Sequence, residues 1–324
     1  MRIELYSPSH KKAWDEFVLR SKNGTFLFQR DYMEYHRDRF EDHSLLLIED
    51  DGKVAALLPA ARLASALSSH AGLTYGGFVT SEAMKLPKML QIFDETLAHL
   101  QKSGFSTFIY KTVPYPYHRL PAEEDRYALF LAGARLLRRG VLAVCDGRFP
   151  PAFQERRKRG AKKARQNGVA VKESEDFAAY WELLTLRLQQ THGSQPVHTI
   201  GEIETLRRSF PAHIRLFAAM EGETMVAGVV IHESDRVARA QYIAASERGQ
   251  DLGALDLVFT ELLSGTYQTK AYFDFGTSDA EDGRHVNQGL IDQKEGYGAR
   301  VVAHDHYELA VKDWRPGQFV EALI

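Results

Sequence analysis

Two histidines that share one short loop are the first candidates for acid–base chemistry. The segment THGSQPVHT places His192 and His198 on either side of Pro196. A histidine titrates near neutral pH and can take the proton of an attacking amine, although loop histidines often only contact solvent or cap a helix. Together with His304 and His306 the pair matches no zinc-binding spacing, so we expect no metal.

A carboxylate and a lysine in the C-terminal third could act on the same substrate. Asp274 ends an apolar run, where its carboxylate can accept a hydrogen bond from an amine or a sugar hydroxyl. It can also cap the next segment, as can Thr277 and Ser278. Asn287 and Lys294 lie in the predicted helix that follows, and Lys294 is otherwise a surface residue paired with a neighbouring acid.

Adjacent glycines and aromatic residues are candidates for substrate binding. Tyr75, Gly76 and Gly77 stand in a predicted strand end, and Gln241 and Tyr242 occupy the corresponding strand of the second half of the chain. Two adjacent glycines let a ligand or a backbone approach closely, or else they form a bulge or a tight turn.

A proline-rich loop in the first half adds Lys111, Tyr117 and His118 to these candidates. Aromatic and basic side chains of this kind suit a nucleotide base and its diphosphate, but they are also ordinary on a surface loop.

Seven basic residues lie between Arg156 and Arg165, in the run ERRKRGAKKARQNG. The run predicts a helix that ends near Gly168 and carries positive charge around much of its surface. Arg159 and Lys163 are expected to face a partner, which would be the phosphates of a thioester cofactor, an acidic acyl carrier protein, a nucleotide diphosphate or tRNA. The alternative is a solvated helix that balances acidic surface elsewhere.

The segment SERGQDLGALD has the composition of a phosphate-binding turn. Its cofactor-binding candidates are Arg248, Gly249, Gln250 and Gly253, because glycine lets the backbone approach a phosphate and arginine pairs with one. The helix that follows adds free N–H groups and positive dipole charge at its N-terminus. The corresponding segment of the first half, TSEAMKLPK, has no glycine, so the second half is the better phosphate site.

The elements that must position these residues occur twice along the chain. The segments LLLIEDDGKVAALLPA and LFAAMEGETMVAGVVI each contain an apolar run, an acidic turn with glycine and a second apolar run. This pattern predicts a β-hairpin in each half, with Val54 matched to Val226.

Helices and strands are predicted at corresponding places around both hairpins. A helix, the strand after the hairpin, a second helix and a further strand cover 10–21, 72–79, 86–101 and 106–111 in the first half, and 176–190, 239–246, 254–263 and 271–276 in the second. A last helix and a terminal strand complete each half. The order predicts an α/β (α+β) fold with two domains, 1–150 and 151–324, that meet near Pro150 and Pro151.

This order of elements resembles the GNAT acyltransferase fold, in which each domain is a mixed sheet flanked by helices. The resemblance implies that an acyl thioester docks where the sheet splays open after its fourth strand, with its pyrophosphate at the start of the next helix. Gln250 and Gly253 fit the family's phosphate turn, whereas Leu255 stands where the family has glycine or alanine. The second domain is therefore expected to bind the thioester, and the first to serve as the scaffold or acceptor half.

The tandem arrangement resembles the Fem family of ligases and its FemAB-like relatives. The tail from Phe273 to Val302 is the most specific part of this likeness, which implies that Lys294 lies near the transferred acyl group. The residues that carry it are Asp274, Phe275, Gly276, Gly283, Asn287, Gly289, Leu290, Lys294 and Gly298.

Within that family, the segments TYGG, PVHT, QYIA and NQGL resemble the N-acyltransferases of nucleotide-linked amino sugars. The resemblance implies transfer of an acyl group from a CoA or acyl-carrier-protein thioester to the amine of a dTDP-type amino sugar, for bacterial surface polysaccharide synthesis. One alternative is a Fem-like ligase that depends on aminoacyl-tRNA and acts on a peptidoglycan precursor. Another is a non-catalytic binding protein that kept the duplicated fold.

Composition restricts the class of protein further. The 324 residues have a formal net charge of -2 and a single cysteine, so binding of nucleic acid by bulk charge and a disulfide framework are both excluded. The N-terminus is not typical of a signal peptide, and the most apolar stretch, 54–73, is interrupted by Pro59, Arg62 and His70. We expect a cytoplasmic protein with no membrane span, and the sequence does not indicate an oligomeric state.

Overall fold

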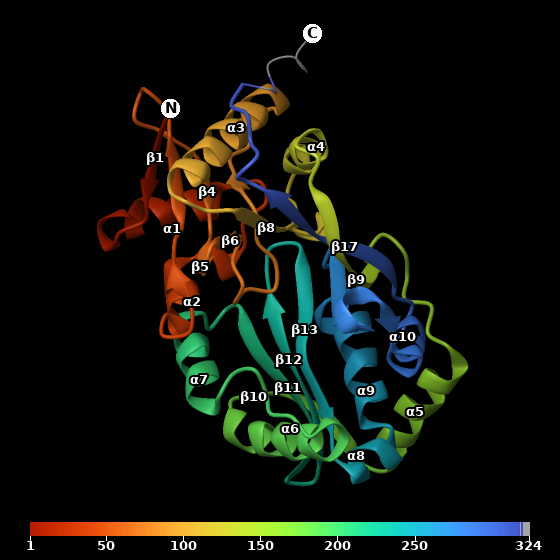
Figure 1. Cartoon of the computed structure of the whole chain (residues 1–324). Coiled ribbons are helices and arrows are strands. Elements are labelled where there is room, and N and C mark those ends of the chain that lie inside the picture. Colours follow the sequence, from red (N-terminus) through yellow and green to blue (C-terminus); the bar gives the residue numbers. More distant parts are fainter. Residues whose placement is uncertain (318, 320–324) are drawn as a thin grey trace. The chain divides into compact units, whose positions relative to one another are not determined.

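The computed structural model describes residues 1–317 and 319, apart from the side chain of His192. Two compact units make up the chain (Figure 1). Unit 1 comprises Met1–Gly140 with Ala303–Ile324, and unit 2 comprises Val141–Val302. These units differ in their bounds from the expected domains 1–150 and 151–324, because residues from the end of the chain belong to unit 1.

Unit 1 combines an antiparallel four-stranded sheet with a second group of short strands. The four-stranded sheet has the order β1 (Arg2–Leu5), β3 (Leu45–Ile48), β4 (Val54–Leu58) and β7 (Val79–Thr80). The second group has the order β17 (Arg300–Ala310), β8 (Thr107–Lys111), β6 (Ala66–Ser68), β5 (Ala61–Leu63) and β2 (Glu41–Asp42). The helices are α1 (Lys11–Arg20), α2 (Arg30–Met33), α3 (Leu86–Lys102) and α4 (Glu124–Leu131), with short 3-10 turns at Pro8–His10, Phe26–Phe28, Glu34–His36 and Tyr115–Tyr117.

The core of unit 1 forms where α3 covers the strands. Phe93 and Leu97 of α3 are fully buried against Leu45 of β3 and Phe108 of β8. The helix buries one stripe of apolar residues at helical spacing, which explains why it was predictable: Met89, Leu90, Ile92, Phe93, Leu97 and Leu100.

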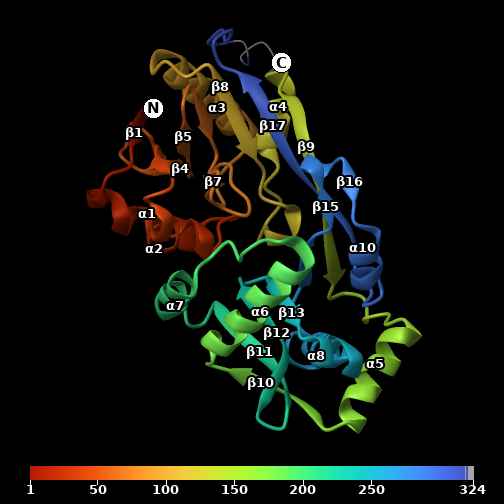
Figure 2. The same ribbon diagram turned by 60° about the horizontal axis from the view of Figure 1, so that its bottom comes forward.

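Unit 2 is a mixed sheet with helices on both faces (Figures 1 and 2). Its strands follow the order β10 (Val169–Ser174), β11 (Ile214–Glu221), β12 (Thr224–Glu233), β13 (Val237–Ala245), β14 (Tyr272–Thr277) and β9 (Arg135–Asp146). The helices are α5 (Glu155–Gln166), α6 (Phe177–His192), α7 (Ile200–Ser209), α8 (Glu247–Leu252), α9 (Ala254–Glu261) and α10 (Gln288–Glu295), with a π-helical turn at Leu262–Thr266, a 3-10 turn at Glu281–Gly283 and a small hairpin of β15 (Asp279–Ala280) and β16 (His285–Val286).

Alternate residues of β12 face the two helical layers of unit 2. Ala227 and Val229 pack in the core that contains α9, whereas a Cβ at Gly228 would lie 2.6 Å from the ring of Tyr180 on α6. Period-two alternation thus buries both faces of the strand, as its nearly continuous apolar sequence requires.

The last strand of each sequence half belongs to the other compact unit. Residues Leu142–Asp146 of β9, from the first half, pair with β14 in unit 2. Residues His306–Ala310 of β17, from the end of the chain, pair with β8 in unit 1. This exchange explains why the compact units differ from the two halves of the sequence.

The structure confirms the predicted α/β (α+β) class, both hairpins and the helix over the basic run. Two local predictions were wrong. Of the predicted strand 72–79, only Val79 belongs to a sheet strand, β7 (Val79–Thr80). The reason is that Gly77 has a φ of +86° and Gly76 approaches the Ser69 backbone too closely for any side chain. The predicted phosphate turn after β13 is the helix α8.

None of the helices within the described residues has the length and apolar character that spanning a bilayer requires.

Candidate active site

The parallel strands β13 and β14 of unit 2 diverge after three residue pairs. They pair from Val237 and Tyr272 to Arg239 and Asp274, and no pairing between them continues past Arg239 in the part of the chain that the structure describes. A register shift between β12 and β13 leaves Gln241 as an extra residue at this point, which is a β-bulge. Beyond it β13 has an open backbone edge that can bond to an extended ligand.

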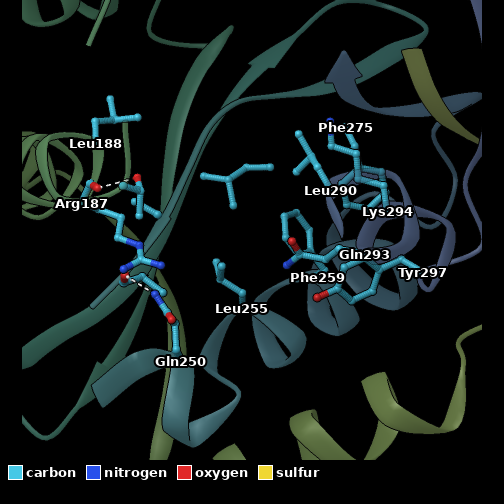
Figure 3. A pocket seen from close by; sticks show the side chains of 14 residues that line it. Arg187, Leu188, Gln250, Leu255, Phe259, Phe275, Leu290, Gln293, Lys294 and Tyr297 are labelled. Carbon is cyan, nitrogen blue, oxygen red and sulfur yellow. Dashed lines mark hydrogen bonds between the residues drawn. The ribbon is translucent and has the colours of Figure 1, made fainter. Parts of the chain in front are cut away.

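A pocket of about 410 Å³ lies beside this open edge (Figure 3). Apolar side chains from five elements form most of its wall: Leu188, Ile243, Leu255, Phe259, Phe275 and Leu290. The polar lining residues are Arg187, Thr191, Gln250, Gln293, Lys294 and Tyr297. The volume suits a small ligand or the arm of a larger one.

Asp274 is fully buried at the point where the two strands separate. Its Oδ2 accepts a hydrogen bond from Nη1 of Arg239 at 2.6 Å, and its Oδ1 accepts from the backbone N–H of Gly276 at 2.7 Å. Arg239 also donates from Nε to the side chain of Gln241 at 3.1 Å. The buried ion pair therefore fixes the end of β14 and the bulge together.

Lys294 reaches into the same region from α10 and is only 4% exposed. Its Nζ donates to the backbone oxygens of Gly276 at 3.1 Å and Thr277 at 2.5 Å. Burial lowers the pKa of Lys294 to about 8, an effect that Asp274 opposes and Arg239 assists.

Asn287 holds α10 in place rather than contacting the pocket. Its Oδ1 accepts from the backbone N–H of Leu290 at 3.0 Å, which makes it the N-cap of the helix that carries Lys294.

His198 and Tyr242 form a second pair, outside the lining of this pocket. Nδ1 of His198 and the Tyr242 hydroxyl are 2.5 Å apart, and the backbone oxygen of His198 accepts from Nε1 of Trp181 at 3.0 Å. His198 is buried, and Thr199 caps α7 immediately after it. His192 is the last residue of α6, and its side chain lies outside the described residues.

The glycines of the predicted phosphate turn serve packing contacts. A Cβ at Gly249 would lie 2.1 Å from the Val226 oxygen, and one at Gly253 would lie 2.7 Å from the Gly160 oxygen of α5. The Gly249 N–H bonds to the Ser246 hydroxyl at 3.0 Å, which caps α8.

The other cofactor-binding candidates are distributed around the same turn. Arg248 pairs with Glu221 on the surface. The amide of Gln250, oriented so that its oxygen faces Arg187, accepts from Nε at 3.1 Å and from Nη2 at 2.8 Å. Arg159 and Lys163 are exposed on α5, and no ion pair to either occurs among residues 1–317 and 319.

The start of α9 already holds an anion of the protein itself. Asp256, in the first turn, accepts from Nη1 of Arg157 at 2.7 Å and from the Tyr297 hydroxyl at 2.6 Å. A carboxylate at a helix N-terminus interacts with the dipole just as a phosphate would. The hydrogen bonds of the Asp256 carboxylate lead to Arg157 of α5 and to Tyr297, so this residue ties α5 and the Tyr297 side chain to the start of α9.

The residues of unit 1 that the sequence suggested for substrate binding form a buried network around β8. Lys111 donates from Nζ to the backbone oxygens of His70 at 3.3 Å and Leu73 at 2.5 Å, and burial, aided by Arg138, lowers the pKa of Lys111 to about 8. The Tyr75 hydroxyl bonds to Thr25 at 2.8 Å.

Neighbouring side chains complete this network. The rings of Tyr75 and Tyr117 lie 4.6 Å apart, and Nε2 of His118 is 3.0 Å from the Val113 oxygen. A Cβ at Gly76 would lie 1.7 Å from the Ser69 oxygen, and one at Gly77 would lie 2.7 Å from the Tyr110 hydroxyl. These two glycines are explained by close packing within unit 1.

Sequence reasoning missed Arg239, Arg187 and Asp256. The first pairs with Asp274 across a parallel register, and the second lines the pocket from α6. A single charged residue in a helix or strand gives no signal by itself, so only the strand register and the helix packing identify these three.

Comparison with known proteins relates part of unit 2 to one family. Residues 152–283 match the acetyltransferase (GNAT) domain. Such domains typically use acyl-CoA, and the predicted acyltransferase activity is confirmed at this level. No curated protein sequence matches the chain.

Solved structures resemble the whole chain. FemX has a TM-score of 0.69 at 12% identity, with 100% of both chains covered. L-PGS from Bacillus licheniformis has a TM-score of 0.60 at 14% identity, with 98% of this chain and 94% of that chain covered. A tandem GNAT protein from the clavulanic acid biosynthesis pathway has a TM-score of 0.53 at 12% identity, with 97% and 100% covered. The predicted tandem GNAT-like fold is confirmed.

Proposed function

We propose that this chain transfers an acyl group from a CoA or acyl-carrier-protein thioester to the amine of a nucleotide-linked amino sugar. The observation that carries the acyl transfer is the pocket of unit 2, which Lys294 lines beside the diverging strands and whose other walls come largely from the segment that matches the GNAT domain. The amino-sugar acceptor, with its dTDP-type nucleotide and its place in bacterial surface polysaccharide synthesis, rests on the sequence resemblance of the segments TYGG, PVHT, QYIA and NQGL.

In the proposed reaction the amine nitrogen attacks the thioester carbonyl, a C–N bond forms and the C–S bond breaks. The oxyanion that develops needs hydrogen-bond donors. Protonated Lys294 has three N–H bonds and gives two of them to main-chain oxygens, so the third serves the oxyanion, together with N–H groups on the open edge of β13. The proton leaves the amine through a base and ends on the thiolate.

The base in this scheme is His198, with its imidazole oriented by Tyr242. Asp274 acts as a positioning residue, because it is fully buried and binds Arg239 and the Gly276 turn. Close placement of amine and thioester supplies much of the rate, on the order of 7 kcal/mol of the barrier, so a strong base is not required.

Thiol release tests the proposal. A panel of acyl-CoAs and acyl carrier proteins is mixed with dTDP-amino sugars, and free thiol is measured over time. We expect release with one donor–acceptor pair, and a loss of at least about tenfold in kcat for Lys294→Ala, since one charged donor to the oxyanion is removed. Lys102→Ala, at an exposed position of α3, is the control. Full activity of Lys294→Ala would reject the assignment of Lys294.

A second candidate function is aminoacyl transfer from tRNA, and the basic outer face of α5 favours it. Ala161 and Ala164 are buried, so the exposed arginine and lysine side chains of α5 lie on the side of the helix that faces away from the core. A surface of this kind binds a phosphate backbone through counterion release. The fold likeness to FemX and to L-PGS agrees with this candidate.

Salt dependence of tRNA binding distinguishes the two candidates. If tRNA is the donor, the logarithm of the affinity should fall linearly with the logarithm of the salt concentration. The double variant Arg159→Ala/Lys163→Ala should reduce that slope by about 1 to 2, because two phosphate contacts are lost. Absence of a complex with charged tRNA at low salt would exclude this function.

A further inference from the structure

Arg187 places a positive charge at one side of the pocket in unit 2. It projects from α6 toward Gln250 (Figure 3). With the Gln250 amide oriented so that its oxygen faces Arg187, this oxygen accepts hydrogen bonds from Nε and Nη2 of Arg187. These two bonds fix the plane of the guanidinium group. Because an amide is neutral, they orient the charge of Arg187 without neutralising it.

No carboxylate compensates Arg187 within the described part of the chain. The lining of the pocket contains two cations, Arg187 and Lys294, and no acidic residue, and no ion pair to Arg187 occurs among the described residues. Other arginines of unit 2 differ, since Arg157 pairs with Asp256 and Arg239 pairs with Asp274. A cation left without a counter-ion in a mostly apolar pocket favours an anionic ligand.

The pocket between the two cations is apolar. Figure 3 shows Arg187 with Gln250 on one side, Lys294 with Tyr297 on the other, and Leu255 between them. Ile243 and Ala245 of β13 line the same space and bring the open strand edge to it. A ligand that matches this arrangement has an anionic group at one end, an extended arm, and its reacting carbonyl near Lys294.

We propose that Arg187 binds a phosphate group of the acyl donor. This inference rests on the proposed acyl transfer and names the group by which the donor is held. Arg187 lines the pocket from α6 and has a neutral hydrogen-bond partner, so the phosphate binds on the α6 side of the pocket. A guanidinium group forms bidentate hydrogen bonds with phosphate, which suits a single phosphate ester.

Two kinds of donor carry that chemistry. In acyl-phosphopantetheine, the phosphate ester and the thioester are at opposite ends of the extended pantetheine chain. At the 3′ end of an aminoacyl-RNA, a phosphodiester lies close to the acyl ester. The shared requirement is a phosphate that Arg187 can contact while the acyl group reaches Lys294.

Calorimetric titration of the full chain tests the anchor with two matched probe pairs. The first pair is 4′-phosphopantetheine and pantetheine, and the second is the RNA trinucleotide CCA and adenosine. In one pair we expect the phosphate-bearing probe to bind at least about tenfold more tightly to the wild type, as one charge-assisted contact provides. Arg187→Gln should abolish that preference and leave the affinity for pantetheine or adenosine unchanged.

Two further variants keep the test independent of folding defects. Gln250→Glu introduces a carboxylate next to Arg187 with little change of shape, and it should weaken the phosphate-bearing probe by a similar factor. Arg208→Gln, on the exposed side of α7, is the matched arginine control and should bind like the wild type.

The outcome identifies the donor or rejects the anchor. Loss of preference in the pantetheine pair assigns a thioester donor, and loss in the RNA pair assigns an RNA donor. Equal affinity of wild type and Arg187→Gln for all four probes would overturn the proposal. Because binding does not require turnover, a phosphate preference that depends on Arg187 without any thiol release would reject the amino-sugar reaction and leave the anchor standing.

Discussion

At the scale of single residues, the site depends on which charges are compensated and by what. Lys294 has main-chain oxygens as its hydrogen-bond partners, Asp274 has an arginine, and Arg187 has a neutral amide. The sequence could select Lys294 and Asp274 because both belong to one short tail. It could not select Arg187 or Arg239, since their roles depend on which element each side chain faces after folding.

The buried ammonium group of Lys294 predicts a pH dependence of stability. Burial lowers its pKa from 10.5 to about 8, so the unfolded chain binds this proton more tightly than the folded chain. The free energy of unfolding therefore rises as the pH increases from about 8 to about 10.5, by up to about 3 kcal/mol for this group alone.

Urea denaturation of the wild type and Lys294→Met at pH 7.5 and pH 10.5 measures this effect. The wild type should gain stability relative to the variant between the two pH values, and Lys102→Met controls for the loss of an exposed lysine. A constant difference between wild type and Lys294→Met would contradict the prediction.

At the scale of elements, the spacing of apolar residues in the sequence identified the helices and strands that bury one regular face. The helix α3 and both hairpins have such a pattern, whereas α8 has six residues and is fixed by contacts that the sequence does not display. Its glycines resembled a phosphate turn, yet Gly249 and Gly253 are required by close approach to β12 and α5. Glycine composition alone could not separate ligand approach from backbone approach.

Gly253 should therefore be far more sensitive to substitution than a glycine in open space. It has a φ of +75° and lies against the Gly160 backbone, so Gly253→Ala combines left-handed strain with a steric clash. We expect a loss of stability of more than about 2 kcal/mol.

Gly222 in the turn between β11 and β12 provides the control. Its φ is +61°, but no atom lies within 4 Å of the position of an added Cβ. Gly222→Ala should cost only the conformational part, about 1 kcal/mol. Equal shifts in the thermal unfolding of the two variants would show that the contact with α5 contributes nothing.

At the scale of the whole molecule, the exchanged terminal strands separate chain order from structural order. The sequence repeat predicted two tandem copies, and each copy has the expected order of elements. The repeat could not predict that β9 and β17 pair with the sheet of the opposite half, because a strand's own sequence does not specify its partner. Leu309, Val311, Trp314 and Phe319, from the end of the chain, consequently pack in the core of unit 1.

Trp314 tests this exchange, because it lies near the end of the chain but packs in unit 1. It is 5% exposed, and its Nε1 donates to Asp94 of α3 at 3.1 Å. Trp314→Ala should remove about 3–5 kcal/mol of stability by opening a cavity. Amide hydrogen exchange should then show faster exchange in α3 and β8, while β11 and β12 of unit 2 keep their protection, since local stability follows local packing.

Val301→Ala, at a position of β17 that is 53% exposed, is the control and should leave exchange unchanged in both units. Equal loss of protection in β8 and β12 on Trp314→Ala would show that the two units unfold as one. Protection retained in β8 would show that the strand exchange does not support unit 1. The expected result, loss confined to α3 and β8, assigns the end of the second sequence half to the stability of the first unit.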